Sequence, residues 1–361
     1  SEARAAATRR LVRFDARACG GTAEPLLAAG REAHGLIHPL CFAGRLVGTV
    51  AVGRRTGGRF GELQDEVVRT FAEFLAIQTL NLRRRDDEVR SRVLARELEI
   101  AREIQRSLLP PVLPRLRGFG LAGGWQAARE VGGDFYDAIA TGDEELLLVV
   151  ADVMGKGVPA ALFATIIRGL VRGLAAHGES PARLLERLNR LLYAELSGVN
   201  MFITAQVVSI DLAGRKIVAA GAGHCPVLYV PEGSREVVPL PTRGVPLGIL
   251  PDAVYRDQSA KLGRPGTLLA HTDGLTDARS PAGARYGEVR LAEWLRSQSF
   301  ARLPAADLRD RLIGELDAFR AGTPMADDQA FLMLTEECAS AEPAADPGAT
   351  ILAEYAPPSA A

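Results

Sequence analysis

A strand-like run of apolar residues from Leu146 to Ala151 ends at a lone carboxylate, Asp152, and a glycine-containing turn follows at once. A continuous apolar run bounded by turn residues predicts a buried β-strand. The segment 150–162, VADVMGKGVPAAL, therefore predicts a strand, a turn and the start of a helix in succession. A carboxylate at this position is compatible with a phosphate-binding loop, a metal ligand or an ordinary turn residue.

Length and composition limit the classes of protein that this chain can represent. The 361 residues predict about two domains, and a hydrophobic content of 47% is sufficient for a sizeable core. A net charge of −1 argues against a dedicated nucleic-acid surface. The four cysteines form no C-x-x-C pair, which predicts a reducing, cytoplasmic environment without structural zinc. No run approaches the roughly 20 apolar residues of a membrane span, so we expect no membrane association.

The N-terminal segment predicts a small α/β unit over residues 1–82. Residues 36–55 read as two strands around a turn at Ala43 and Gly44. Residues 60–85 read as a helix. The residues that follow helical spacing are Val67, Phe71, Phe74, Leu75 and Gln78.

Residues 83–109 form a distinct, highly charged segment that predicts a helical linker. A narrow apolar stripe on a helix of mixed charge is typical of a coiled coil, so we expect a homodimer through this linker. A solvated connecting helix is the alternative. Prolines at 110, 111 and 114 end the helix. The stripe consists of Val89, Leu94, Leu98, Ala101, Ile104 and Leu108.

Residues 110–335 predict an α+β domain, because strands in hairpins surround a cluster of helices. Two central helices are expected at 158–176 and 181–196, the second with Ser180 as N-cap and Pro181 in its first turn. Two further helices fit 287–299 and 304–321. Acidic residues, prolines and alanines without Lys or Arg predict a disordered tail over 336–361. The expected strands are 121–128, 145–153, 202–212, 215–222, 226–230, 267–272 and 330–335.

Acidic residues recur beside apolar runs in this domain. Asp152 and Asp273 each end such a run, Asp327 and Asp328 precede one, and Asp134 lies in VGGDFYDAI. A charge at the end of a buried strand is costly unless it is paired or bound to a cation, and clustered carboxylates suit Mg²⁺ or Mn²⁺. Two such ions can activate a water and clamp a phosphoryl group. Each Asp alone is better explained as a turn residue, and only the recurrence of the pattern makes metal binding an open alternative.

Other phosphate and hydrolase chemistries lack their motifs. The GKGV segment has no Walker-type spacing, and no G-x-S-x-G elbow is present. No cysteine is followed by arginine at the spacing of a cysteine-phosphatase loop. We expect packing or turn roles for the histidines, including His224 and His271, which flank turns.

Seven segments of the chain, in their order, resemble the motifs of bacterial PPM-type serine/threonine phosphatases of the SpoIIE and RsbU subgroup. The resemblance covers about 110–335 and implies a β-sandwich flanked by helices, with two or more Mg²⁺ or Mn²⁺ ions at one end. It also implies direct attack of metal-activated water on a phosphoserine or phosphothreonine. The segments are VGGDFYD, ADVMGKGVPAAL, MFITAQVVSIDL, AGAGHCPVLYV, GVPLGIL, HTDGLTDA and ADDQAFLML.

The same resemblance implies roles for individual residues. Asp152 matches the carboxylate that bridges both metals, and the Val153 carbonyl matches a backbone ligand beside it. Asp273, and Asp327 or its neighbour Asp328, match further metal ligands. Asp134 matches the acidic residue of the first motif, close to the metals. The expected catalytic residues are Asp134, Asp152 and Asp273.

Two smaller features of the chain bear on activity. Ala330 stands where the family usually has Thr or Ser, which removes a hydroxyl near the site but no ligand. In the subgroup, the helices expected at 158–176 and 181–196 can act as a switch that completes the metal site. Gly155 and Gly157 are expected to let the backbone turn tightly there.

The resemblance also implies a regulatory setting. Residues 36–85 resemble the C-terminal half of a GAF sensor domain, which predicts a truncated GAF-like unit. The usual substrate in the subgroup is a phosphorylated anti-sigma-factor antagonist, a small STAS-domain protein, in stress or developmental signalling. The competing hypothesis is a non-catalytic dimeric scaffold with a phosphatase-like fold.

Overall fold

The computed structural model describes residues 12–15, 34–54, 59–110, 112–240, 243–262, 265–298 and 303–336. The chain divides into two units, Ser1–Glu97 and Leu98–Ala361. The tail predicted to be disordered lies outside the described residues, except for its first residue, Glu336.

The first unit contains a three-stranded antiparallel sheet in the order β1-β2-β3. The strands are β1 (Val12–Asp15), β2 (His34–Phe42) and β3 (Arg45–Arg54). Ala43 and Gly44 join β2 to β3 with φ angles of 45° and 77°, the left-handed conformation of a tight hairpin turn. The hairpin predicted for 36–55 is therefore present.

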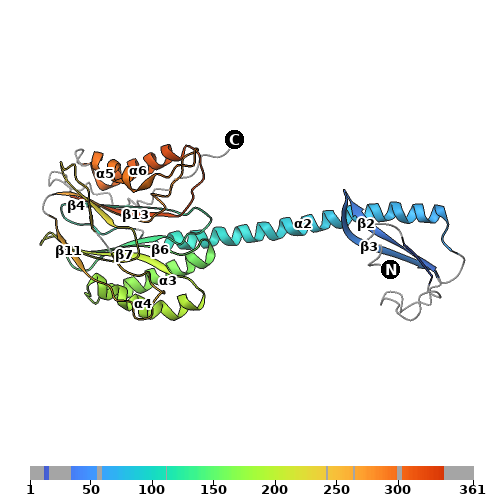
Figure 1. Ribbon diagram of the computed structural model, residues 1–361, viewed down its shortest axis with the longest axis horizontal. Coiled ribbons are helices and arrows are strands. Elements are labelled where there is room, and N and C mark those ends of the chain that lie inside the picture. The colour runs from blue at the N-terminus through green and yellow to red at the C-terminus, as the bar shows by residue number, and fades with distance from the viewer. Residues whose placement is uncertain are drawn as a thin grey trace. The chain divides into compact units, whose positions relative to one another are not determined.

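Helix α2 (Glu62–Leu108) runs without a break across the boundary predicted at residue 82 (Figure 1). It buries Ala72 and Ala76 in a cluster with Leu40 and Val47 of the sheet. Of the residues that carry the helical spacing, Val67, Phe71 and Phe74 are exposed, whereas Leu75 packs against this cluster. The small alanines allow the helix to approach the sheet closely, and this packing outweighs the larger apolar stripe.

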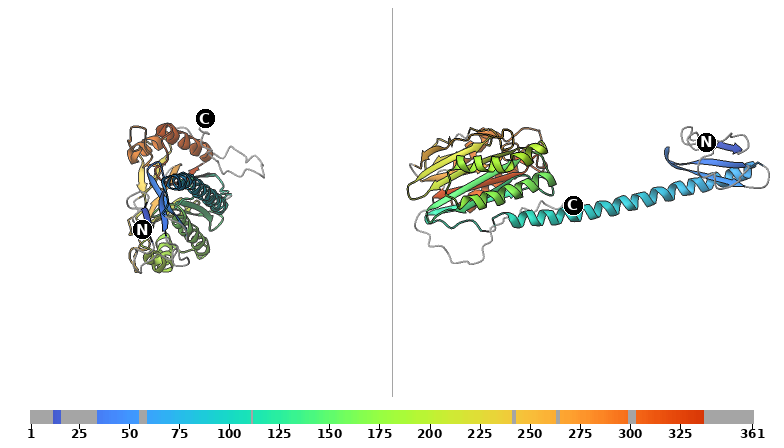
Figure 2. Two further views of the ribbon diagram at one scale, coloured as in Figure 1. Left: turned by 90° about the vertical axis from the view of Figure 1, so that its right-hand side faces the viewer. Right: turned by 90° about the horizontal axis from the view of Figure 1, so that it is seen from below.

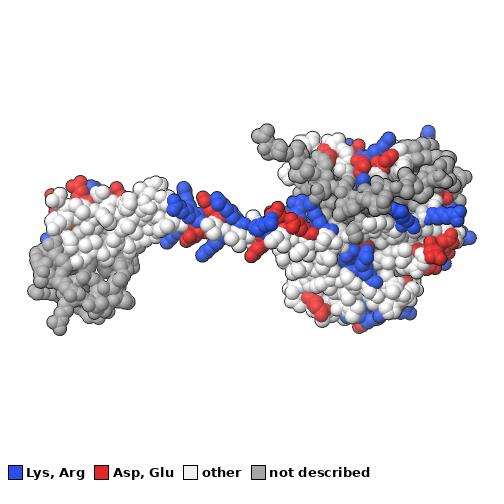
Figure 3. All heavy atoms as spheres, turned by 180° about the vertical axis from the view of Figure 1, so that it is seen from behind, with Lys and Arg blue, Asp and Glu red and all other residues white. Residues whose placement is uncertain are grey.

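The second part of α2 carries an exposed apolar stripe that differs from the predicted one. Its members follow one another at steps of seven, four, seven and four residues, which places them on one helix face. Of the predicted stripe, Leu98, Ala101 and Leu108 are instead partly buried. Acidic and basic side chains alternate along the surface of α2 (Figure 3). The exposed stripe consists of Leu82, Val89, Val93, Ile100 and Ile104.

The second unit is a sandwich of two five-stranded sheets (Figures 1 and 2). The first sheet has the order β10-β9-β12-β13-β4, and the second has the order β11-β8-β7-β6-β5. Every pairing within them is antiparallel. The strands are β4 (Phe119–Gln126), β5 (Phe135–Ala140), β6 (Glu145–Val153), β7 (Ile203–Asp211), β8 (Lys216–Ala222), β9 (Val227–Pro231), β10 (Val238–Leu240), β11 (Gln258–Lys261), β12 (Gly266–His271) and β13 (Gln329–Glu336).

Helices cover both outer faces of the sandwich. Helices α3 (Val158–Ala175) and α4 (Pro181–Gly198) lie on the second sheet, and α5 (Gly287–Gln298) and α6 (Ala305–Arg320) lie on the first. Three apolar clusters separate the four layers, one between the sheets and one beneath each helix pair. This is the α+β sandwich flanked by helices that the sequence predicts.

Most of the predicted elements are present, and the exceptions have physical causes. β5 was missed because Asp137 interrupts its apolar pattern, and β10 and β11 are short edge strands. The Ser180 side chain makes no capping bond; the Ala182 amide instead donates to Asp257 Oδ1 at 2.8 Å. Glu336 is not part of a tail: it ends β13 and pairs with Arg215 at 2.9 Å.

Helix α3 is long and apolar enough, by length and composition alone, to cross a membrane. In this fold it packs on β5 and β6, with Ala160, Ala164 and Ile167 among its buried residues. This packing accounts for only part of its apolar composition, because Val158, Leu162 and Ile166 on the same helix are exposed.

Candidate metal centre

The antiparallel pairing of the strands brings the predicted acidic residues to one end of the sandwich. Asp152 lies near the end of β6, next to the start of β5, which follows Asp134 directly. Asp273 follows β12, and Asp327 and Asp328 precede β13, the strand that pairs with β12. Each of the five carboxyl groups affects the pKa of at least one other or is affected by it, so the structure brings together the complete predicted acidic set.

Asp134 and Asp152 form the centre of this group. Their carboxyl groups lie close enough to affect each other's pKa. Burial, followed by repulsion from Asp152, raises the pKa of Asp134 well above its usual range. Burial and repulsion from Asp273 raise the pKa of Asp152 to about 6. Asp134 Oδ2 is buried, and no donor among the described residues reaches it.

Asp273 and Asp327 lie at the more open side of the group. Loss of hydration and repulsion from Asp327 raise the pKa of Asp273. Lys156, from the turn after β6, lies with its Nζ 2.8 Å from Asp327 Oδ1 and also donates to the Ala326 carbonyl. Lys156 therefore places a positive charge beside the carboxylates. In the sequence, Lys156 is noticeable only as part of the GKGV segment, which lacks the spacing of a P-loop.

Asp328 is held differently from its neighbours. Its Oδ1 accepts the Ala128 amide, and its Oδ2 accepts the Gly133 amide, each at 2.7 Å. A Cβ at Gly274 would lie 1.7 Å from the Asp328 carbonyl oxygen, so only glycine fits there. Asp328 therefore ties the loop before Asp134 to the start of β13.

The Val153 carbonyl lies against the same loop. A Cβ at Gly133 would be 2.8 Å from this oxygen, so the two backbones approach closely. The turn that follows uses Gly155 and Gly157 at φ angles of 94° and 81°, as the sequence analysis expected of these glycines. Gly157 is also the N-cap residue of α3.

Polar residues behind the carboxylates were not identified from the sequence as part of the site. The Thr272 hydroxyl donates to the Ala330 carbonyl at 3.3 Å and accepts the Ala330 amide at 3.0 Å. The same hydroxyl partly offsets the rise in the pKa of Asp134. His224 bonds to the Thr204 hydroxyl at 2.8 Å and to the His271 carbonyl at 3.1 Å. Thr204 pairs with Asp152 in the sheet. The only sequence signal for these residues was their position beside the acidic motifs.

The chemistry of this group fits hard divalent cations, although the side chains do not form a closed ligand cage. Several carboxylates and a backbone carbonyl are the donors that Mg²⁺ and Mn²⁺ prefer. Asp134 Oδ2 has no hydrogen-bond donor among the described residues, and neighbouring carboxyl groups repel one another. A bound cation stabilises both. Within the described part of the chain, however, no three Asp, Glu, His or Cys side chains are grouped as a metal site as they stand.

Comparison with known proteins identifies the family. Residues 142–336, more than half of the chain, match the family described as Stage II sporulation protein E (SpoIIE). The chain belongs to the SpoIIE family. The predicted resemblance to bacterial PPM-type phosphatases of the SpoIIE and RsbU group is thereby confirmed, and the carboxylates lie at one end of a SpoIIE sandwich.

Two curated proteins are similar in sequence to this SpoIIE-family chain. It is 31% identical to Protein IcfG of Synechocystis over 285 residues, which cover 71% of this chain and 45% of that protein. It is 29% identical to phosphoserine phosphatase RsbU of Bacillus subtilis over 187 residues, which cover 52% of this chain and 55% of RsbU. The chain thus spans about half the length of these curated relatives.

Solved structures show the same fold. The SiaA-PP2C domain of Pseudomonas aeruginosa matches with a TM-score of 0.59 and 25% identity, covering 68% of this chain and 98% of that domain. The RsbU and RsbW domains of a Mycobacterium tuberculosis protein match with a TM-score of 0.52 and 27% identity, covering 64% of this chain and 63% of that one. The predicted sandwich architecture is confirmed, whereas the GAF-like unit and the coiled coil remain predictions.

Proposed function

We propose that this chain is a metal-dependent serine/threonine protein phosphatase. The observation that carries the proposal is the convergence of five carboxyl groups at one end of a SpoIIE-family sandwich, where burial and repulsion from neighbouring carboxyl groups raise the pKa values of Asp134 and Asp152. A bound divalent cation relieves such repulsion, and it is the usual reason for this arrangement in an otherwise apolar fold.

The residues have distinct roles in this proposal. Asp152, Asp273, Asp327 and the Val153 carbonyl hold two or more Mg²⁺ or Mn²⁺ ions, and Asp134 lies beside them. When bound, these ions supply an activated water and neutralise charge on the phosphoryl group. Asp328 positions the Asp134 loop through the Ala128 and Gly133 amides, and its role as a ligand is secondary.

We further propose that the substrate is a phosphorylated STAS-domain antagonist of an anti-sigma factor, in the cytoplasm of a bacterium. The support is the family membership and the similarity to RsbU. Incubation of the full chain and Mn²⁺ with a phosphorylated STAS protein should release inorganic phosphate. Failure to do so, with p-nitrophenyl phosphate still hydrolysed, would remove this substrate and leave the activity in place.

The activity itself is tested with Asp152→Asn. This variant removes the proposed bridging charge while preserving shape, so Mn²⁺-dependent hydrolysis of p-nitrophenyl phosphate should fall by at least about a hundredfold. The matched control is Asp143→Asn, an exposed residue in the turn before β6, which should retain full activity. Equal rates for both variants, with both folded, would contradict the assignment.

A non-catalytic scaffold is the second candidate function. It is favoured by the ion pair between Lys156 and Asp327 and by Ala330, which replaces the usual hydroxyl. Calorimetric titration of the chain with Mn²⁺ separates the two. Binding that Asp152→Asn abolishes supports the enzyme, whereas no binding to the folded wild type supports the scaffold.

A further inference from the structure

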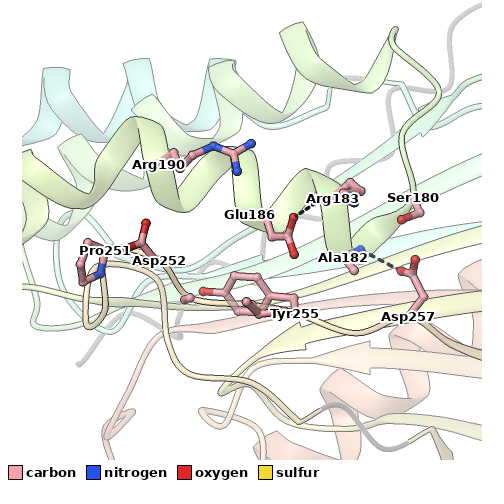
Figure 4. A pocket seen from close by; sticks show the side chains of 11 residues that line it. Ser180, Ala182, Arg183, Glu186, Arg190, Pro251, Asp252, Tyr255 and Asp257 are labelled. Atoms are coloured by element: carbon pink, nitrogen blue, oxygen red, sulfur yellow. Dashed lines mark hydrogen bonds and ion pairs between the residues drawn. The ribbon is translucent and has the colours of Figure 1, made fainter.

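A polar cavity lies between helix α4 and the segment 251–257, and the proposed phosphatase chemistry does not use it. Its volume is about 570 Å³, and it shares no lining residue with the acidic group. Figure 4 shows Arg190 and Glu186 on the α4 side, with Asp252 and the Tyr255 ring on the other. The lining residues are Ser180, Ala182, Arg183, Glu186, Arg190, Pro251, Asp252, Ala253, Val254, Tyr255 and Asp257.

The two walls of the cavity are joined by hydrogen bonds that fix its shape. Asp257 Oδ1 accepts the Ala182 amide in the first turn of α4 at 2.8 Å. Asn189, also on α4, donates to the carbonyls of Leu250 and Pro251 at 2.8 and 3.1 Å. The cavity is therefore formed by the fold itself, which is typical of binding sites for small molecules.

Some charged groups in the cavity are already paired. Arg183 and Glu186 form an ion pair with each other at 2.9 Å, and the Glu186 side chain is only 13% exposed. Asp257 is committed to the α4 amide. These residues define the walls but have limited capacity for a ligand.

Three other groups in the cavity have no ion pair or side-chain hydrogen bond to the part of the chain that the structure describes. Tyr255 is 4% exposed, and its hydroxyl has no hydrogen-bond partner in the described chain. Burial and the nearby Glu186 raise the pKa of Tyr255 to about 12, so the hydroxyl keeps its proton and can donate. The side chains of Arg190 and Asp252 are exposed, and neither forms an ion pair with a residue that the structure describes. A buried hydroxyl without a partner is costly, which indicates that something else satisfies it.

We propose that this cavity binds a small zwitterionic molecule of the amino-acid class. Its carboxylate pairs with Arg190, its ammonium group pairs with Asp252, and a polar side chain accepts a hydrogen bond from the Tyr255 hydroxyl. A ligand with a single charge can pair with Arg190 or with Asp252, but not with both. The volume lies within the range of about 300–1,000 Å³ of small-molecule pockets.

The experiment is calorimetric titration of the full chain with L-serine, L-asparagine and L-glutamine, with acetate and ethanolamine as probes of a single charge. We expect saturable binding of at least one amino acid and much weaker binding of both single-charge probes. Because binding is measured directly, the result does not depend on phosphatase activity. Addition of EDTA should leave it unchanged.

Variants locate the binding in the cavity. Arg190→Gln and Asp252→Asn alter exposed side chains, and each should weaken binding about tenfold to a hundredfold through loss of a charged hydrogen bond. Tyr255→Phe should weaken it about threefold to tenfold. Tyr193→Phe is the matched control: it removes a phenol from α4 outside the cavity and should change nothing.

Three results would overturn the proposal. The first is no binding of any of the three amino acids to the folded chain. The second is acetate or ethanolamine binding as tightly as the amino acids, which would mean that one charge suffices. The third is binding that persists unchanged in both Arg190→Gln and Asp252→Asn, which remain informative if Tyr255→Phe fails to fold.

Discussion

At the scale of single residues, His224 shows how partly buried polar groups support the acidic end of the sandwich. It accepts a hydrogen bond at Nδ1 from the Thr204 hydroxyl and donates from Nε2 to the His271 carbonyl, an arrangement that suits the neutral ring. Burial and the neighbouring His271 lower the pKa of His224 to about 3. The folded state therefore excludes a proton that the unfolded chain readily accepts.

This difference predicts acid sensitivity in a defined range. Between the unfolded value of 6.5 and the folded value of about 3, only the unfolded chain binds the proton, so the free energy of unfolding falls as the pH falls. Relative to His224→Gln, the wild type should lose about 1.4 kcal/mol per pH unit below 6.5. Urea denaturation at pH 7, 6 and 5 measures this.

The control for this prediction is His177→Gln, an exposed histidine after α3. It should follow the wild-type pH dependence. If His224→Gln also follows it, the His224 ring is not held neutral by its surroundings and the prediction is wrong.

The sequence could predict the carboxylates but not the residues that support them. Asp134, Asp152, Asp273 and Asp327 are visible because each interrupts or borders an apolar run. Lys156, Thr272 and the hydrogen bonds of His224 depend on which strands become neighbours, and local patterns do not contain that information.

At the scale of secondary-structure elements, a buried ion cluster attaches α3 to β5. Asp137 is fully buried, and Arg172 contacts both its oxygens, at 2.6 and 2.8 Å. Arg168, whose side chain is 12% exposed, lies 3.1 Å from the same carboxylate. Asp137→Asn should lower the free energy of unfolding by about 3 kcal/mol, because it leaves two arginines without their counter-charge.

Urea denaturation at neutral pH checks this value against an exposed ion pair. Arg285→Gln removes the pair between Arg285 and Asp277, whose side chains are 59% and 32% exposed, and should cost less than about 1 kcal/mol. Equal effects of the two substitutions would show that the Asp137 cluster does not hold α3 in place.

The last turn of α2 is attached to the loop before Asp134 by one side chain. Gln105 donates to the Gly132 carbonyl at 2.6 Å and accepts the Gly132 amide at 3.0 Å. Gln105→Leu leaves both buried backbone groups without partners, so the free energy of unfolding should fall by about 1–3 kcal/mol. Hydrogen exchange of the Gly132 and Gly133 amides should accelerate.

Gln78→Leu is the matched control for this prediction, because it makes the same change at an exposed position of the same helix. It should leave both amides protected. Unchanged exchange in Gln105→Leu would mean that α2 does not hold this loop.

The sequence predicted the elements of the sandwich better than their contacts. The apolar runs of β6, β7 and β12 and the periodicity of α3 and α4 were sufficient to locate them. The cap of α4 comes from Asp257, far along the chain, and β5 is stabilised around Asp137 by arginines from α3. Such long-range partners override local propensity, which is why Ser180 and β5 were misjudged.

At the scale of the whole molecule, the exposed stripe on α2 predicts the oligomeric state. Leu82, Val89, Val93, Ile100 and Ile104 present a narrow apolar face within a surface of mixed charge. An apolar seam of this kind is typical of coiled coils and is satisfied when a second copy packs against it. We therefore expect the chain to be a homodimer through α2.

Light scattering during size exclusion should give about twice the mass of 38.5 kDa for the wild type. Val93→Glu and Ile100→Glu place buried charges in the proposed seam, so each should shift the mass toward that of one chain. Ser91→Glu adds the same charge on the opposite face of α2 and should leave the dimer intact, because its side chain stays in solvent. A dimer that survives both seam substitutions must use another surface, and the linker would then have no role in assembly.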